Sequence, residues 1–396
     1  MKGRRVELLT AARMRAIEAA AIAAGQVTGL ELMERAAEGA CAGLALGPVA
    51  VLCGPGNNGG DGYAIGRLLA AKGGAATVFE MTDAPATPDA AENRRRWVEG
   101  GGKVRPLADA ADMLRRVAAQ VHLTGAESGA DLPRVVVDAL FGTGLSRPLD
   151  GAAAELARMS CEKGWPFTIS VDIPSGLCAD SGRALGGVAF QASATATFHG
   201  AKLGHHLADG PARCGSLRVV DIGLTAPPPD PHLSVMAVGG GSGAAIAEGF
   251  EKTGAAHKYG YGHALILSGG VGKGGAARMA ARGALRIGAG LVTLGCPPAA
   301  VLENAGRLDA IMLRPIADAD ALAGALEDPR INVVALGMGL GVGERAGPRT
   351  RALVEAALAA RRATVLDADA LSIFADAPDG LLARLHPGCV LTPHMG

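Results

Sequence analysis

The sequence predicts an α/β protein with two domains, each built on a parallel sheet that helices cover on both faces. Short, continuously apolar runs alternate with longer segments of helical periodicity, as expected for buried parallel strands and their crossover helices. The chain has 396 residues, enough for two or three domains of ordinary size. Four prolines between Thr225 and Pro231 form a stiff break, after which the alternation starts again. We therefore expect a first domain over residues 1–225, a linker over 226–231 and a second domain over 232–396.

Two helices precede the first strand. Thr10 is the predicted N-cap of a helix that continues to Gly25, since Met14, Ile17 and Ala21 recur at helical spacing. A second helix is expected over about residues 29–46. The strands of the first domain then follow as the apolar runs VAVLC (49–53), ATVFE (76–80), RVVVDAL (134–140), PFTISVDI (166–173), ATATF (194–198) and LRVVDIGL (217–224).

The second domain repeats this alternation after the linker. Helices are expected near residues 275–287, 318–327 and 348–361. The strands that they separate are HALILS (263–268), AGLVTLG (289–295), NVVALG (332–337) and ATVLDA (363–368), and the chain ends in VLTPHMG (390–396).

Charge and composition exclude several classes of protein. Lys and Arg total 38, as do Asp and Glu, so the formal net charge is zero, unlike that of a general nucleic-acid binder. The seven cysteines include no C-x-x-C pair, which argues against a disulfide scaffold and a zinc ribbon. No apolar stretch is long enough to span a bilayer, and the N-terminus has no signal-peptide core. We expect a soluble cytoplasmic protein with neither nucleic-acid nor membrane partners.

A Gly-rich loop, GPGNNGGDG over residues 54–62, follows the first strand of the sheet. Gly54, Gly56 and Gly59 match the dinucleotide pattern G-x-G-x-x-G, and Glu80 could serve as the ribose-binding acid. The same match is equally typical of a tight strand-to-helix turn. Amides that converge in such a loop, together with a helix N-terminus, favour a bound phosphate.

The polar residues of this loop indicate more than a plain dinucleotide site. Asn57 and Asn58 add side-chain carbonyl oxygens, and Asp61 adds a carboxylate. A pyrophosphate site does not need these acceptors, so the loop favours a cation beside the phosphate.

Two further strands of the first domain end in aspartate. Asp138 is followed by Gly142–Gly144, and Asp172 is followed by Ser175. Each aspartate by itself is equally typical of a helix cap. Because ligands bind beyond the carboxyl ends of parallel strands, three such loops together favour one shared cleft.

These motifs together resemble the NAD(P)HX epimerase family, the N-terminal half of bifunctional enzymes that repair hydrated NADH and NADPH. The resemblance covers residues 8–225 and rests on LTAARMRAIE, NNGGDG, DALFGTGLSRP, DIPSGL and TATFHGAKLGHHLADGPARCG. It implies a Rossmann-like three-layer domain, and potassium held by Asn58, Asp138 and Ser175. The residues that it implies for substrate binding are Asn57, Asn58, Gly59, Gly60, Asp61, Gly142, Thr143, Gly144, Leu145, Ser146, Arg147, Pro148 and Asp172.

The reaction of that family inverts C6 of the hydrated nicotinamide ring, which carries a hydroxyl group. The resemblance therefore implies an isomerase in which Asp172 is catalytic and moves a proton, assisting either reversible loss of the hydroxyl or opening of the ring. Residues 86–130 depart from the family because they form an unusually long, Ala-rich segment between the first two site loops.

The second domain contains SGGVGKGGAA (268–277), which fails the phosphate-loop pattern because Leu267 and Gly274 replace its first Gly and its Ser or Thr. With ALGMGLG, VLDADAL and LTPHMG, residues 232–396 resemble the ribokinase-like ADP/ATP-dependent NAD(P)HX dehydratase, a lyase. The resemblance implies ADP or ATP with Mg²⁺. Its implied substrate contacts are Ala276, Gly339 and His394, with Asp367 and Asp369 nearby. A GMGLG string alone is also typical of a turn, and a lone His of a structural role.

The dehydratase family continues after T-P-H-x-G with a G-T-G-D loop that holds nucleotide phosphates and supplies the catalytic Asp. Residues 232–396 contain no G-T-G-D. The sequence therefore predicts an incomplete ribokinase-like domain, and a chain that epimerises but does not dehydrate.

Other interpretations stay open at this stage. His199, His205 and His206, with Lys202 among them, suggest a metal site. Surface histidines, or histidines that support the site beside the cleft, fit better because no Cys or carboxylate accompanies them. A Rossmann dehydrogenase using NAD and a non-catalytic nucleotide-binding protein are the competing functions. We expect a homo-oligomer that takes hydrated NADH or NADPH as its small-molecule substrate.

Overall fold

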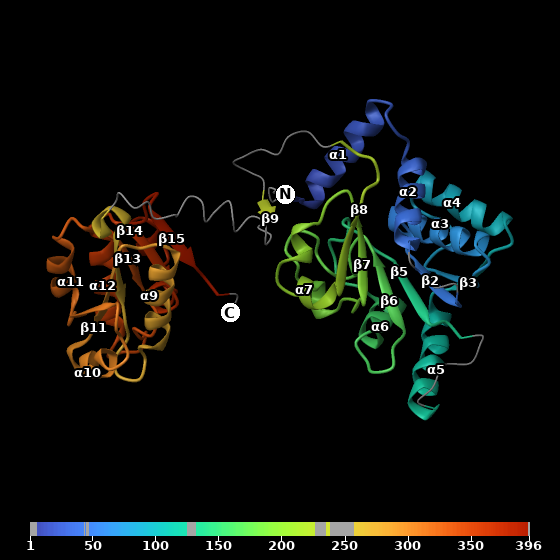
Figure 1. Ribbon diagram of the computed structural model, residues 1–396. Helices are drawn as coiled ribbons and strands as arrows, with labels where there is room; N and C mark the ends of the chain where they lie inside the picture. The colour runs from blue at the N-terminus through green and yellow to red at the C-terminus, as the bar shows by residue number, and fades with distance from the viewer. Residues whose placement is uncertain are drawn as a thin grey trace. The chain divides into compact units, whose positions relative to one another are not determined.

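The computed structural model describes residues 6–42, 44, 47–124, 132–225, 235–237 and 257–394. The chain divides into two compact units, Gly3–Gly239 and Gly240–Gly396, and each contains one large parallel sheet (Figure 1). The expected linker at 226–231 lies outside the described residues. Beyond it, β9 (Val235–Ala237) pairs antiparallel with β1 (Val6–Leu8), so this short strand belongs with the first unit. The domain bounds expected from the sequence stay a prediction.

The first unit has a seven-stranded sheet in the described residues, with the order β4-β3-β2-β5-β6-β7-β8. All neighbouring strands in it are parallel. The order reverses between β2 and β5, which makes this pair the topological switch point, where ligands bind in such sheets. The strands are β2 (Val49–Cys53), β3 (Ala76–Glu80), β4 (Lys103–Pro106), β5 (Val135–Ala139), β6 (Phe167–Val171), β7 (Ala194–Phe198) and β8 (Ser216–Val220).

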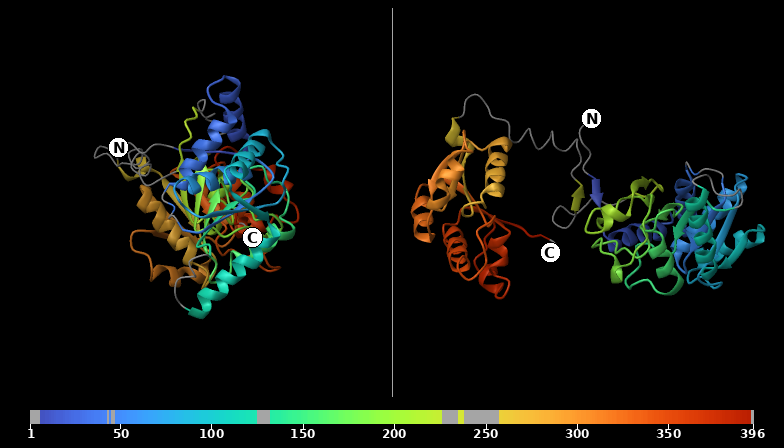
Figure 2. Two further views of the ribbon diagram at one scale, coloured as in Figure 1. Left: turned by 90° about the vertical axis from the view of Figure 1, so that its right-hand side faces the viewer. Right: turned by 90° about the horizontal axis from the view of Figure 1, so that it is seen from below.

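Helices cover both faces of this sheet, as the views in Figure 2 and the two cores show. Val49, Val51 and Cys53 face one core, whereas Ala50 and Leu52 face the other, because alternate strand residues point to opposite sides. The helices are α1 (Ala11–Ala23), α2 (Gly29–Cys41), α3 (Asn57–Ala71), α4 (Pro88–Glu99), α5 (Ala108–Thr124), α6 (Gly151–Met159) and α7 (Gly210–Arg213), with 3-10 turns at Leu185–Gly187 and Leu203–His205.

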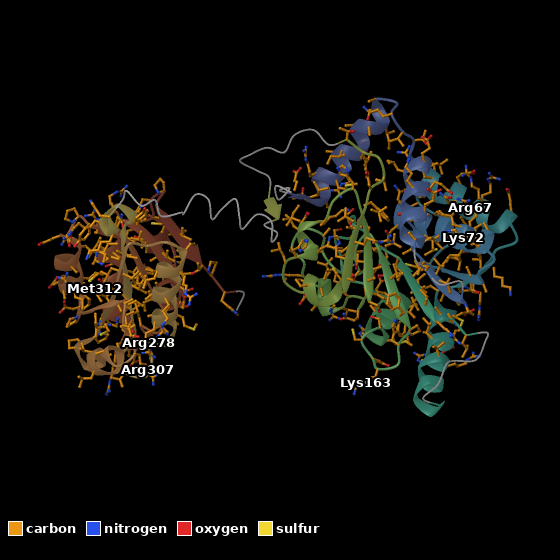
Figure 3. All side chains as sticks on the ribbon, viewed as in Figure 1. Arg67, Lys72, Lys163, Arg278, Arg307 and Met312 are labelled. Atoms are coloured by element: carbon orange, nitrogen blue, oxygen red, sulfur yellow. The ribbon has the colours of Figure 1, made fainter. Side chains whose placement is uncertain are left out.

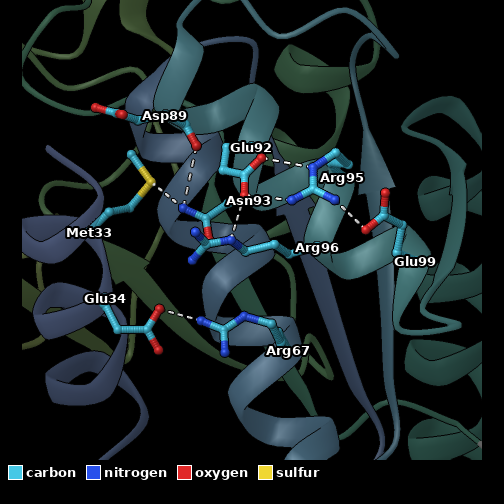
Figure 4. A network of polar contacts seen from close by, with 9 residues as sticks. All are labelled: Met33, Glu34, Arg67, Asp89, Glu92, Asn93, Arg95, Arg96 and Glu99. Carbon is cyan, nitrogen blue, oxygen red and sulfur yellow. Dashed lines mark hydrogen bonds and ion pairs between the residues drawn. The ribbon is translucent and has the colours of Figure 1, made fainter.

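The helices α2, α3 and α4 pack closely on one another (Figure 4). Glu34 of α2 pairs with Arg67 of α3, and the buried Asn93 of α4 donates through Nδ2 to Met33 Sδ at 3.0 Å. A Cβ on Gly60 of α3 would lie 2.6 Å from the Met33 sulfur and 3.0 Å from Ala90 Cα. Gly60 therefore lets three helices approach each other beneath the loop that follows β2.

The second unit has a six-stranded parallel sheet in the described residues, with the order β12-β11-β10-β13-β14-β15 and a switch point between β10 and β13. Its strands are β10 (His263–Leu267), β11 (Leu291–Cys296), β12 (Met312–Pro315), β13 (Ile331–Leu336), β14 (Ala363–Asp367) and β15 (Cys389–Thr392). Its helices are α9 (Gly275–Ile287), α10 (Val301–Ala305), α11 (Ala319–Leu326), α12 (Gly347–Ala359), α13 (Asp369–Ser372) and α14 (Asp379–Leu382), with 3-10 turns at Lys258–Tyr261 and Pro298–Ala300.

Two cores again lie on opposite faces of the second sheet. Leu265 and Leu267 of β10 pack with α11 and α12, whereas Ala264 and Ile266 pack with α9. Arg278 of α9, labelled in Figure 3, bonds Glu303 Oε1 at 3.0 Å and Asn304 Oδ1 at 2.8 Å. These contacts fix α9 beside α10.

The structure confirms the predicted α/β class and differs from the sequence-based prediction in several elements. A short strand, β1, precedes the two N-terminal helices, and α10 and β12 were not predicted. The second helix ends at Cys41, short of the expected residue 46. The Ala-rich segment 86–130 contains α4, β4 and α5, which the alternation of apolar runs did not indicate, because β4 is only four residues long and mostly exposed. None of the helices in the described residues is long and apolar enough to cross a membrane.

Candidate functional site

A cavity of about 510 Å³ lies at the switch point of the first sheet, beyond the carboxyl ends of its central strands. Its walls come from the loops after β2 and β5, the ends of β6 and β7, and one face of α1. The residues implied by the family resemblance that line it are Asn57, Asn58, Asp61, Gly142, Thr143, Gly144, Leu145, Ser146, Arg147 and Asp172. Three separate sequence motifs thus meet at one concave surface.

Gly59, Gly60 and Pro148 are not among the residues that line this cavity. Both glycines are buried in the first turn of α3, where a Cβ on Gly59 would lie 1.9 Å from the Gly54 carbonyl oxygen. Their small size therefore serves the packing of the loop. The substrate-binding role expected for these three residues stays a prediction.

Asp172 and Lys202 form a buried ion pair at the cavity. Lys202 is 1% exposed, and its Nζ donates to Asp172 Oδ1 at 2.7 Å, to Thr197 Oγ1 at 2.8 Å and to the Phe198 carbonyl at 3.1 Å. The other oxygen of Asp172, Oδ2, accepts from the Thr143 amide at 3.2 Å. Asp172 also has a positive φ of 66°, a strained conformation that is concentrated at functional sites.

The lysine determines the charge of Asp172. Burial by itself would raise the pKa of this carboxyl, but the charge of Lys202 and its hydrogen bond outweigh burial and lower the pKa below its usual value. Asp172 is therefore an ionised carboxylate at neutral pH, with one oxygen directed toward the cavity lining.

His205 supports this pair from behind. Its Nδ1 accepts from the Lys202 amide at 2.9 Å, so Nε2 carries the proton and donates to the Asp172 carbonyl at 2.9 Å. Burial lowers the pKa of His205 to about 4, so its ring is neutral. His206 is exposed, as expected for a surface histidine. The described residues include no group of three His, Cys, Asp or Glu side chains arranged to hold a metal.

Asp138 and Ser175 are not among the residues that line the cavity, but they contact each other, and Ser175 Oγ accepts from the amide of Phe141, which does line it. Asp138 is fully buried; Oδ1 accepts from Ser175 Oγ at 2.6 Å, and Oδ2 accepts from Ser170 Oγ at 2.8 Å and from the Ser175 amide at 2.9 Å. Burial raises the pKa of Asp138, although the hydrogen bonds from Ser175 and Ser170 lower it. Among the described side chains, neither Lys nor Arg pairs with this carboxyl.

The three residues implied for potassium carry oxygen ligands of different kinds. Asn58 lines the cavity, and its buried Nδ2 has no hydrogen-bond partner, so this N–H donor is available to an acceptor atom of a bound substrate. A buried carboxyl without a cationic side chain needs a proton, a cation or hydrogen bonds, and the described side chains give Asp138 hydrogen bonds from Ser170 and Ser175. Asn58, Asp138 and Ser175 supply amide, carboxylate and hydroxyl oxygens, which are hard-cation ligands.

Glu80, the alternative ribose-binding acid, is fully engaged with other side chains. It accepts from Arg94 Nε and Nη2, both at 2.8 Å, and from the Tyr63 hydroxyl at 2.7 Å. It does not line the cavity at the switch point. The geometry therefore disfavours the dinucleotide-binding pattern of a Rossmann dehydrogenase.

Sequence reasoning missed several residues of the cavity. Lys202 was considered only as a neighbour of histidines, although it lies in the tract that carried the family resemblance. The helix α1 contributes Met14, Arg15 and Glu18, all three from the MRAIE part of the opening motif. Thr87 also lines the cavity, and its Oγ1 donates to Asn57 Oδ1 at 2.5 Å. These residues meet only in the folded chain, and their spacing in the sequence gives no sign of it.

In the second unit, the residues expected for the dehydratase lie at or near the carboxyl ends of the strands. A Cβ on Gly269 would lie 2.1 Å from the Gly339 carbonyl oxygen, so the loops after β10 and β13 touch. Asp369 Oδ2 accepts from the Gly341 amide at 2.7 Å, and Asp367 Oδ1 accepts from Thr392 Oγ1 at 2.7 Å. Ala276 is in the first turn of α9, and His394 follows β15.

Two family models match the chain, one to each unit. The model of the YjeF-related protein N-terminus matches residues 29–204, and the model of NAD(P)H-hydrate dehydratase matches residues 264–396. Among solved structures, the ADP/ATP-dependent NAD(P)H-hydrate dehydratase from Bacillus subtilis, co-crystallised with ATP and Mg²⁺, is 28% identical; the alignment covers 31% of this chain and 42% of that one, with a TM-score of 0.26.

Relatives match over either the first unit or the whole chain. The NAD(P)H-hydrate epimerase of Roseobacter litoralis is 39% identical over 231 residues, covering 55% of this chain and 99% of the relative. The bifunctional NAD(P)H-hydrate repair enzyme of Salinibacter ruber is 34% identical, covering 98% of this chain and 74% of the relative. That of Coxiella burnetii is 32% identical over 406 residues, covering 97% of this chain and 73% of the relative. Since both units match in order along almost the whole chain, this protein belongs to the family of bifunctional NAD(P)H-hydrate repair enzymes.

Proposed function

We propose that the first unit interconverts the R and S forms of hydrated NADH and NADPH in the 510 Å³ cavity, with Asp172 as the residue that moves a proton. The observation that carries the proposal is the buried pair of Asp172 with Lys202, which lies at the cavity formed by the three site loops. The relatives that are 39% and 32% identical are named as an NAD(P)H-hydrate epimerase and a bifunctional repair enzyme, which supports the same reaction here.

Each of the surrounding residues has a distinct part in this reaction. Lys202 keeps Asp172 ionised, and the Thr143 amide orients the oxygen that does not bond the lysine. A carboxylate held in this way can accept a proton from a hydroxyl group within hydrogen-bond reach. Asn57, Asn58, Asp61 and the loop from Gly142 to Arg147 hold the nucleotide around it.

Potassium belongs to the same proposal. Asn58, Asp138 and Ser175 would hold it, and its charge would offset the buried Asp138 carboxylate and favour a nearby phosphate group of the substrate. Support comes from the oxygen atoms that the three side chains carry and from the lack of a cationic side chain at Asp138 among the described residues.

The match of residues 264–396 to NAD(P)H-hydrate dehydratase supports the second activity of the family, with ADP or ATP and Mg²⁺ as its cofactors. Ala276, Gly339 and His394 would contact the hydrated nucleotide there. This match favours the dehydratase activity over the sequence-based expectation that the chain does not dehydrate. The homo-oligomer, the cytoplasmic location and the division into domains at 1–225 and 232–396 stay predictions.

The epimerase proposal is tested by Asp172→Asn in the full chain. We expect the rate of epimerisation, measured by chromatographic separation of R and S hydrates against an enzyme-free blank, to fall about 10²- to 10⁴-fold. Asp150→Asn is the matched control, since this exposed Asp at the start of α6 makes no capping hydrogen bond and should leave the rate unchanged.

A measurement of nucleotide binding distinguishes an epimerase from a non-catalytic nucleotide-binding protein. If Asp172→Asn epimerises at the rate of the unchanged protein, the catalytic assignment is wrong. If neither protein exceeds the blank while both bind the nucleotide, a non-catalytic nucleotide-binding protein becomes the better description.

A further inference from the structure

The N-terminal helix α1 is an integral wall of the cavity, although it lies outside the residues 29–204 that match the family model. The chain that leads into α1 is held at Leu9 by two hydrogen bonds. The Leu9 amide donates to the Ala201 carbonyl at 2.8 Å, and the Leu203 amide donates to the Leu9 carbonyl at 3.0 Å. Leu9 thus pairs with the segment that carries Lys202. The Ala11 amide also donates to Asp180 Oδ1 at 2.7 Å.

The two sides of α1 have different surroundings. Met14, Ile17 and Ala21 are buried in the core, which holds the helix in place. Arg15 and Glu18, three residues apart and so on the same side of a helix, line the cavity together with Met14. The docked helix therefore holds one carboxyl group, that of Glu18, at the cavity that contains Asp172.

The carboxyl group of Glu18 is chemically different from that of Asp172. Asp172 bonds Lys202, Thr197 and the Thr143 amide, whereas no hydrogen bond or ion pair within the described residues ends at the Glu18 carboxyl. Glu18 is partly buried, and the buried cation of the site, Lys202, already bonds Asp172. The Glu18 carboxyl is therefore free to contact a bound substrate.

The surroundings of Glu18, above all its burial, raise its pKa and so favour the protonated form. Burial raises the pKa of Glu18, the charge of Asp172 raises it further, and Lys202 and Arg15 act in the opposite direction. Asp61, another carboxyl of the cavity, has its pKa raised by burial, by Asp172 and by Glu18. Two carboxyl groups whose surroundings push their protonation in opposite directions are typical of an acid and base pair.

We propose that Glu18 is a further catalytic residue of the epimerisation, the acid that protonates the C6 hydroxyl as it leaves, while Asp172 is the base; this inference rests on the proposed function of the cavity. Glu18 gives its proton to the hydroxyl oxygen. The C6–O bond breaks with its electron pair on oxygen, water leaves, and the lone pair of ring N1 forms an N1=C6 double bond.

The return step restores the ring with the opposite configuration. Water adds to C6 from the other face, the electron pair of the double bond returns to N1, and the excess proton of the added water goes to the Asp172 carboxylate. Exchange of protons with solvent restores Glu18 to its acid form and Asp172 to its carboxylate. The step needs no oxidant or reductant, and it replaces the C6 oxygen with one from water.

The first test is the oxygen isotope. In H₂¹⁸O, each inversion catalysed by the full chain should place one ¹⁸O at C6, measured by mass spectrometry of the separated hydrates against an enzyme-free blank. Inversion with retention of the original oxygen would overturn the proposed step, because it would show that the C6–O bond stays intact.

The second test is Glu18→Gln, which keeps the shape of the side chain and removes the acid. We expect kcat for inversion and for ¹⁸O incorporation to fall together by about 10²-fold or more, with KM within about threefold. Glu38→Gln, at an exposed glutamate of α2, is the matched control and should retain full activity. In Glu18→Ala, added formic or acetic acid should restore part of the rate, and the same acids should not accelerate the control.

The outcomes separate this inference from the proposed function. If Asp172→Asn is inactive and Glu18→Gln is within twofold of the unchanged protein, the inference on Glu18 is wrong and the epimerase assignment stands. If the unchanged protein does not exceed the blank, the proposed function itself is wrong. A rise in KM alone for Glu18→Gln, without a fall in kcat, would make Glu18 a binding residue and also overturn the inference.

Discussion

The two units share a topology but use their switch points differently. In the first unit, the loops after β2 and β5 border a cavity of about 510 Å³ with a buried Lys202 and Asp172 beside it. In the second unit, the loops after β10 and β13 pack against each other so closely that Gly269 and Gly339 leave no room for a Cβ. Asp367 and Asp369 of the second unit are partly exposed, whereas Asp138 of the first is fully buried.

This difference shows that a parallel sheet selects only the place of a site. An aspartate at a strand end is found both beside the open cavity of the first unit and beside the closely packed loops of the second. Burial decides what such an aspartate can do, because a charge removed from water needs a cation, a proton or hydrogen bonds. The first unit therefore depends on a buried ion pair, Lys202 with Asp172, whereas the Arg278 and Glu303 pair of the second unit is partly exposed.

The largest expected effect comes from removing the cation of the buried pair. Lys202→Met leaves Asp172 as a buried charge without its partner, so the free energy of unfolding of the first unit should fall by about 3–5 kcal/mol. Both tryptophans of the chain, Trp97 and Trp165, are in the first unit, so tryptophan fluorescence during urea unfolding reports on that unit. Lys273→Met, at an exposed lysine after β10, should change this transition by less than about 0.5 kcal/mol. Equal effects of the two substitutions would contradict the contrast between the units.

A smaller effect is expected from pH, through His205. Its pKa is about 4 in the folded protein, against 6.5 for a free side chain, so between these values the unfolded chain binds a proton that the folded protein does not. Stability from this group is present above pH 6.5 and is lost as the pH falls toward 4, at up to about 1.4 kcal/mol per pH unit.

The raised pKa values of Glu18 and Asp61 make the folded protein less stable as the pH rises, opposite to the effect of His205. The contribution of His205 is therefore measured by comparing a His205 variant with the unchanged protein. Between pH 6.5 and 5, unfolding followed by tryptophan fluorescence should depend less steeply on pH in His205→Gln than in the unchanged protein, by about 2 kcal/mol in total. His206→Gln, at the exposed neighbour, should leave the dependence unaltered. An identical slope in His205→Gln would show that this ring does not remain neutral on folding.

The smallest expected effect on stability comes from replacing a glycine by alanine in α3 or in α9, the helices that follow the switch-point strands β2 and β10. Gly60→Ala in α3 places a Cβ 2.6 Å from the flexible end of Met33 and 3.0 Å from Ala90 Cα, and should destabilise the first unit by about 1 kcal/mol. A Cβ on Gly283 of α9 meets nothing within 4 Å, so Gly283→Ala should stabilise the second unit by about 0.5–1 kcal/mol. Urea unfolding followed by hydrogen exchange of peptides from each unit measures both changes. A stabilising Gly60→Ala would show that α2, α3 and α4 are not packed as closely as described.

The sequence by itself determined the α/β class, most strands and the three loops of the first site. Apolar runs such as VAVLC and the glycine and asparagine pattern that follows are local signals, because a buried strand and a tight turn restrict the residues that can form them. The family resemblance rested on the same local motifs. These signals also placed Asp138 and Asp172 at strand ends, which in parallel sheets gather at one edge.

The tertiary structure decided which groups are buried together, and hence their charge. Lys202 is thirty residues from Asp172 along the chain, yet their side chains bond at 2.7 Å. Glu18 reaches the cavity because Leu9 pairs with the segment that carries Lys202. Gly60 lies against Met33 of α2, a contact between helices that the sequence did not indicate. Burial and long-range contact control pKa and packing, and neither has a local signature in the sequence, since both depend on side chains brought from distant parts of the chain.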